Sequence, residues 1–155
     1  MTTETLQTIA IGISAISAIA AAISAYFSAR NSKITLDLYK KEKREKLHEE
    51  LNRILEIGIE YPYLESAQFT SKWLENRESN DEKYLRYDMY SNLMFNYLHH
   101  VCEHFNYDKS LIHDFVDIKT WVRLHKLVWL HPVDENDNID GYDEKFRNII
   151  NSYLK

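Results

Sequence analysis

Residues that end helices or cross-link chains are scarce in this sequence. Its 155 residues include three glycines, two prolines and one cysteine, Cys102. A single cysteine excludes a disulfide within the chain and fits a reducing compartment. Because glycine and proline are few, there are few points at which a helix must stop. The sequence therefore predicts long helices, and we find no convincing strand pattern and no internal repeat.

Charge is absent from residues 5–29 and dense after them. Residues 30–46 carry a net charge of +4, and residues 47–155 carry −8. An acidic body does not favour nucleic acid as its partner. The basic segment is better explained by lipid headgroups.

The uncharged run of 25 residues predicts a transmembrane helix. At about 1.5 Å per residue, such a helix crosses a hydrocarbon core of about 30 Å. Basic residues follow the run, so the positive-inside rule predicts a single-pass inner-membrane protein whose C-terminal domain is cytoplasmic. Two alternatives stay open. One is a cleaved signal peptide, although no basic region precedes the run. The other is a weakly apolar helix that packs in a soluble bundle.

Small residues recur in this run at four-residue spacing. That spacing lets two helix backbones approach closely, and hydroxyl groups can bond across the interface. We therefore expect self-association into a homo-oligomer. A plain anchor and a serine-lined pore are the alternatives. The candidate association residues are Ala10, Ser14, Ala18 and Ala22, together with Ser17, Ala21 and Ala25.

A cluster of basic residues follows the run and predicts contact with membrane lipid. Each basic side chain near an anionic surface contributes about 1 kcal/mol of attraction. A solvated helix face is the alternative. The candidate headgroup contacts are Lys40, Lys41, Lys43, Arg44 and Lys46.

The pattern as a whole predicts an all-α protein in three parts. Residues 1–30 form the transmembrane anchor, residues 31–60 a basic juxtamembrane linker helix, and residues 61–155 a small cytoplasmic helical bundle. Within the bundle we expect helices near residues 64–76, 81–105, 109–130 and 142–154. The second of these should begin at an N-cap, Asn80 or Asp81. Its apolar face predicts the core: Tyr90, Met94, Tyr97, Val101 and Phe105.

Two histidines, His100 and His104, are spaced so that one helix face could present both to a metal ion. No second ligand pair follows, and ordinary partly buried polar residues explain the pattern better. The pair His113–Asp114 occurs in metal-dependent phosphohydrolases, but the further ligands of such a site are missing. We therefore predict no metal and no cofactor.

Two other polar segments have structural explanations. Acidic residues from Asp134 onward suggest a calcium loop, but Lys145 stands where the twelfth-position glutamate is required, which favours a solvated connection. A ligand-binding groove is a second possibility, although ion pairs around aromatic packing are the commoner outcome. Its residues would be His113, Asp117, Arg123, His125 and His131, with Trp121 and Trp129. Catalysis has no positive support.

The order of these parts resembles that of uncharacterised bacterial single-pass helical proteins found beside mobile-element and antiviral defence genes. The resemblance rests on the apolar N-terminal helix and on the segments LYKKEKREK, EYPYLESAQFTSKW and DFVDIKTWVRLHKLVWLHP. It implies a membrane effector that responds to a protein partner encoded nearby. We therefore expect a non-enzymatic effector or scaffold that self-associates and binds a partner. A tethered enzyme or ligand-binding module that uses the His-rich helices is the alternative, and a simple structural anchor also stays open.

Overall fold

The computed structural model describes residues 3–132 and 139–154, without the side chains of residues 4–16. The described residues are helical and contain no strand, so the all-α prediction is confirmed. The chain divides into two compact units, residues 1–43 and residues 44–155. The calcium-like stretch that begins at Asp134 lies mostly outside the described residues, as do the side chains of Ala10 and Ser14.

The predicted transmembrane helix is wrong. In the part of the chain that the structure describes, no helix is both long and apolar enough to cross a membrane. Helix α1 runs over Thr3–Glu60, and apart from Thr3 its side chains are described from Ser17 onward. Among these side chains alanine and serine dilute the isoleucines, and charged residues recur from Arg30 onward.

The first unit consists of α1 residues up to Lys43. All its described side chains are exposed, including several large apolar ones. Ile19, Ile23, Tyr26 and Phe27 are each more than half exposed.

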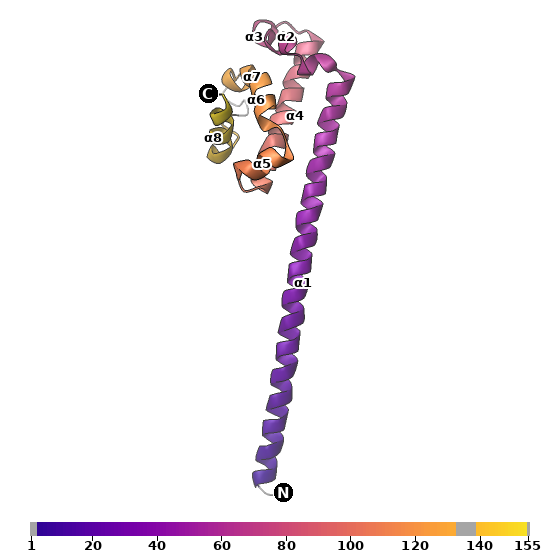
Figure 1. Ribbon diagram of the computed structural model, residues 1–155, viewed down its shortest axis with the longest axis vertical. Coiled ribbons are helices and arrows are strands. Elements are labelled where there is room, and N and C mark those ends of the chain that lie inside the picture. The colour runs from indigo at the N-terminus through magenta and orange to yellow at the C-terminus, as the bar shows by residue number, and fades with distance from the viewer. Residues whose placement is uncertain (1–2, 133–138, 155) are drawn as a thin grey trace. The chain divides into compact units, whose positions relative to one another are not determined.

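The second unit, which contains α4 to α8 (Figure 1), has a core that is rich in aromatic side chains. Residues 44–60 of α1 contribute Leu47 and Ile54, both buried. The long helix α4 (Glu82–His104) supplies the largest share of the core, and its predicted apolar face is confirmed because Tyr90, Met94, Tyr97 and Val101 are buried. Phe105 follows the helix and packs against the core while partly exposed.

Short helices surround α4. They are a 3-10 helix (Pro62–Glu65), α2 (Ala67–Thr70), α3 (Trp73–Asn76), α5 (Lys109–Phe115), α6 (Ile118–Leu124), α7 (Lys126–Leu130) and α8 (Glu144–Tyr153). Figure 1 shows α6 and α8 in the same part of this unit, and the two helices are in contact.

The helix predicted over residues 109–130 is divided into three. Val116 adopts an extended conformation that ends α5. Asp117 then caps α6 by accepting a hydrogen bond from the backbone N–H of Thr120. His125 ends α6 and precedes α7. The apolar periodicity was continuous across these breaks, whereas the local preference of Asp117 for an N-cap prevailed over it.

The helix predicted over residues 64–76 is likewise divided, into α2 and α3 with part of the 3-10 helix before them. The predicted start of α4 is confirmed, because Asp81 accepts a hydrogen bond from the backbone N–H of Lys83.

Candidate functional site

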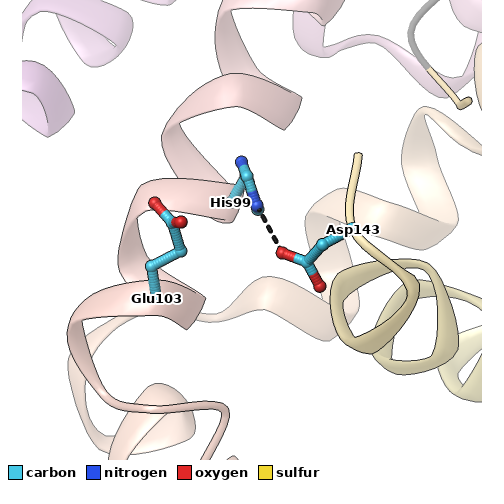
Figure 2. Close-up of side chains that lie close together, drawn as sticks. All are labelled: His99, Glu103 and Asp143. Carbon is cyan, nitrogen blue, oxygen red and sulfur yellow. Dashed lines mark hydrogen bonds and ion pairs between the residues drawn. The ribbon is translucent and has the colours of Figure 1, made fainter. Parts of the chain in front are cut away.

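Three side chains of kinds that can ligate a metal ion meet where the end of α4 approaches the start of α8. His99 and Glu103 lie one turn apart on α4, and Asp143 is the N-cap residue of α8 (Figure 2). One donor atom from each residue lies within 4.8 Å of the other two. His99 Nε2 is 2.8 Å from Asp143 Oδ2. The cluster therefore joins two helices that are far apart in sequence.

Helix capping fixes the Asp143 carboxylate. Its Oδ1 accepts a hydrogen bond from the backbone N–H of Phe146 at 2.9 Å, as an N-cap side chain does. Its Oδ2 accepts hydrogen bonds from the Tyr107 hydroxyl and from His99. An ionised carboxylate can only accept, so the hydrogen of this His99 bond is on Nε2. Three donors, from α4, from α8 and from the turn that follows α4, thus hold one carboxylate.

These donors also set the ionisation of Asp143. Burial by itself would raise the pKa of the carboxyl group. The hydrogen bonds from Tyr107, His99 and the Phe146 N–H outweigh burial and hold the pKa of Asp143 well below its usual range. Asp143 is therefore a stable anion at neutral pH.

Aromatic packing holds the His99 ring. The centroid of its ring is 5.2 Å from that of Tyr142 and 5.0 Å from that of Phe146. The side chain of His99 is nevertheless 20% exposed and that of Asp143 40% exposed. An open groove of about 410 Å³, lined by Tyr107, Asp143, Glu144 and Lys145, lies at the Asp143 side. The cluster is thus both held in place and accessible to solutes.

A second polar group lies inside the core. His125 is fully buried, and its Nδ1 is 3.0 Å from the hydroxyl of Tyr87. Its Nε2 lies 3.5 Å from Glu65 Oε1, which is an ion-pair distance but longer than a normal hydrogen bond. Glu65 also accepts a hydrogen bond from the Tyr90 hydroxyl. Although burial would raise the pKa of Glu65, the nearby His125 imidazole and the hydrogen bond from Tyr90 prevail and lower it.

The two histidines that the sequence suggested as a pair, His100 and His104, have different neighbours. His100 Nδ1 lies 3.1 Å from Glu50 Oε2, and the His104 ring packs edge-on against Phe105. His113 Nε2 is 2.9 Å from the Tyr153 hydroxyl. The neighbouring His99 instead lies close to two carboxylates, those of Glu103 and Asp143. The i,i+4 spacing of His99 and Glu103 was a signal for this cluster, but Asp143 is 40 residues further along, and only the fold brings it close.

The residues of the predicted groove have separate partners. Asp117 caps α6, and Arg123 Nε donates to the backbone carbonyl of Tyr153.

The histidines of the predicted groove have other partners. His125 belongs to the buried group with Tyr87 and Glu65, and the His131 backbone carbonyl accepts a hydrogen bond from Arg77. The Trp129 indole donates to Asn151. These contacts are those of a packed helical domain.

The candidate association residues Ser17, Ala18, Ala21, Ala22 and Ala25 are exposed in the first unit. Of the predicted headgroup contacts, Lys40, Lys41 and Lys43 are exposed on the same unit, and the Lys43 ammonium lies over the Tyr39 ring. In the second unit Lys46 is exposed, and the Arg44 guanidinium lies 5.9 Å from the centre of the Phe115 ring.

Comparisons with models of known protein families, with curated proteins and with solved structures found no match.

Proposed function

We propose that this chain is a non-enzymatic scaffold whose N-terminal helix self-associates and whose helical domain binds a protein partner. The proposal is supported chiefly by the apolar surface of the first unit. Eight large apolar side chains of residues 17–43 are between 47% and 64% exposed: Ile19, Ile23, Tyr26, Phe27, Ile34, Leu36, Leu38 and Tyr39. Exposed large apolar side chains in this number usually mark an interaction site.

A second copy of the same helix would suit this surface. At 100° per residue, Ile19, Ile23 and Phe27 fall on one side of the helix, and Ser17, Ala21 and Ala25 fall on the other. Large side chains of one copy could therefore pack on the small side chains of another, which allows close approach of the backbones. Packing of this kind is also the main source of stability for long helices in water.

Exchanging apolar for charged side chains on this helix tests the assembly. The double variant Ile19→Glu/Ile23→Glu of the full chain should be monomeric where the unaltered protein is oligomeric, as measured by analytical ultracentrifugation. The double variant Leu111→Glu/Leu130→Glu is the matched control, because these residues are about equally exposed but lie in the second unit. A protein that is monomeric at every concentration, or variants that behave alike, would refute self-association.

Ionic strength separates apolar packing from charge pairing. Residues 30–46 carry +4, so parallel copies repel one another through this segment. Salt screens the repulsion and should strengthen the assembly. Dissociation at high salt would instead indicate an assembly held by ion pairs.

A lipid surface is the alternative partner of this helix. Lys40, Lys41 and Lys43 would then contact anionic headgroups. Flotation with vesicles that contain anionic phospholipid distinguishes lipid binding from self-association. A protein that is monomeric in buffer and floats only with anionic vesicles would replace self-association with lipid binding.

The partner-binding part of the proposal is supported by a patch on the second unit. Leu85, Arg86 and Met89 share one side of α4, and Leu85 and Met89 are exposed. The Arg86 guanidinium lies 4.0 Å from the centre of the Tyr61 ring and donates to the Tyr63 hydroxyl at 2.8 Å. Tyrosine, arginine and methionine are enriched in protein interfaces.

A photo-crosslinking amino acid at Met89 tests this patch in the native host. We expect one discrete adduct from position 89 and none from the control position Leu111, which is also exposed. Equal labelling from both positions would refute a specific partner surface. The resemblance to proteins encoded beside antiviral defence genes makes the products of neighbouring genes the first partners to examine.

A further inference from the structure

We propose that His99, Glu103 and Asp143 form a binding site for one divalent first-row transition ion, of which Zn²⁺ binds most tightly among the biologically common candidates Mn²⁺, Fe²⁺ and Zn²⁺. The ion would join the end of α4 to the N-terminus of α8. The proposal concerns the second unit alone and does not depend on whether the first unit self-associates.

The distances among the donor atoms suit a metal ion. Zinc is bound by imidazole nitrogen and carboxylate oxygen at about 2.0–2.2 Å, so adjacent ligands around it lie about 3 Å apart. His99 Nε2 and Asp143 Oδ2 are already 2.8 Å apart. Glu103 presents a third donor within 4.8 Å of both. Its side chain is exposed and long, so rotation of its own bonds can complete the site without a change in the backbone.

Two of the three ligands are held in position before any ion binds. The Tyr107 hydroxyl and the Phe146 N–H orient the Asp143 carboxylate. The rings of Tyr142 and Phe146 hold the His99 imidazole. Hydrogen bonds to ligating carboxylates and packing around ligating histidines are typical of metal sites in proteins. This arrangement separates the cluster from a chance grouping of surface acids.

Metal binding needs a simple rearrangement of one hydrogen. In the present hydrogen bond, Nε2 carries the hydrogen and donates it to Asp143. When the ion binds, the neutral imidazole carries its hydrogen on Nδ1 instead, and the Nε2 lone pair becomes a ligand. Asp143 Oδ2 exchanges the bond from His99 for the bond to the ion and keeps the bond from Tyr107. Its Oδ1 keeps the helix cap.

The donor set also indicates the kind of ion. One imidazole nitrogen and two carboxylate oxygens form a mixed site, whereas magnesium and calcium sites are built from oxygen alone. Among divalent ions, Zn²⁺ binds such donors more tightly than Mn²⁺ or Fe²⁺. Two carboxylates balance the charge of the ion, and three protein ligands leave room for water.

Titration of the full chain tests the site. The protein, free of any affinity tag and treated with a chelator, is titrated with Zn²⁺ by calorimetry and with Co²⁺ by visible absorption. We expect one ion per chain and a cobalt absorption band that Zn²⁺ removes. The variants Glu103→Gln and Asp143→Asn should each bind at least about tenfold more weakly. Asparagine is also a good N-cap, so Asp143→Asn keeps the start of α8.

Three neighbouring residues provide matched controls. Glu144→Gln removes an acid beside Asp143, and His100→Ala and His104→Ala remove the other histidines of the same helix end. We expect all three variants to bind like the unaltered protein. Circular dichroism confirms that each variant is folded. The proposal is overturned if binding is not stoichiometric, if Glu103→Gln and Asp143→Asn bind as tightly as the unaltered protein, or if His100→Ala abolishes binding.

Discussion

Two buried tyrosines on α4 should respond in opposite ways to loss of the same oxygen atom. The Tyr87 and Tyr97 side chains are 0% and 2% exposed, and both lie within one helix. The Tyr87 hydroxyl is 3.0 Å from His125 Nδ1. The Tyr97 hydroxyl has no hydrogen-bond partner among the residues that the structure describes. Phenylalanine preserves the ring at either position and removes only the hydroxyl group.

The expected energies follow from what each hydroxyl leaves behind. Tyr87→Phe leaves the buried Nδ1 of His125 without a partner, which costs about 1–3 kcal/mol of the free energy of unfolding. The Tyr97 hydroxyl is buried without a hydrogen bond, which destabilises the folded state. Tyr97→Phe removes this hydroxyl, so it should be neutral or stabilising by up to about 1 kcal/mol. The two variants should therefore differ by at least about 1 kcal/mol.

Urea unfolding measures the free energy of unfolding of both variants. The fluorescence of the three tryptophans, Trp73, Trp121 and Trp129, reports the transition. Equal unfolding energies for the two variants would refute this reasoning, as would a larger loss for Tyr97→Phe. In the first case the Tyr87–His125 contact would contribute nothing. In the second, the Tyr97 hydroxyl would have a partner of its own.

Three further predictions concern other parts of the second unit. Burial, with the nearby Asp143 carboxylate, raises the pKa of Cys102 to about 12, so the thiol should resist a disulfide reagent at pH 8 and react only when urea unfolds the chain. Fast reaction of the folded protein would contradict this. Gly58 lies inside α1, and an added Cβ would meet the Tyr90 hydroxyl and the Glu65 side chain at 3.5 and 3.6 Å, which are ordinary contacts. Gly58→Ala should therefore stabilise the fold by about 0.5–1 kcal/mol in the same urea assay, and a loss of stability would show that the space is insufficient. The pKa values of Glu65 and Asp143 lie below their ordinary range, so unfolding takes up protons, and the free energy of unfolding should fall as the pH decreases through about 4. Asp143→Asn should make this decrease shallower in a pH series of urea titrations, and an unchanged slope would contradict it.

Periodicity in the sequence was a reliable guide to α4 and a poor guide to the segments around it. An unbroken apolar face from Tyr90 to Val101 predicted a buried helix, because a helix of a globular protein turns such a face toward the core. The pattern over residues 109–130 was just as continuous, yet it covers three helices. There, single residues decide the outcome, because an aspartate such as Asp117 can bond to the backbone that follows it and start a new helix.

The candidate metal cluster was only half visible in the sequence. The four-residue spacing of His99 and Glu103 places both on one helix face, and the same rule led to His100 and His104. The difference between the two pairs lies in what the fold places opposite them. Asp143 faces His99, whereas Glu50 of α1 faces His100. No local pattern specifies a contact between residues 40 or more positions apart.

The transmembrane prediction is contradicted in the part of α1 that the structure describes. The absence of charge is necessary for a membrane span, but apolarity must also be sufficient. Alanine and serine satisfy the first condition and contribute little to the second. The same residues favour close packing of helices, so this composition is consistent with an interface between helices.

The brevity of α5, α6 and α7 bears on how the second unit folds. These helices have seven, seven and five residues, well below the roughly 12–15 at which a helix becomes even marginally stable alone. They can form only against a surface that already exists. Helix α4, with 23 residues, presents Phe95 to Trp129 of α7 and Tyr97 to Trp121 of α6. Folding should therefore proceed from α4 outward, and a peptide of residues 109–130 in isolation should have no fixed structure.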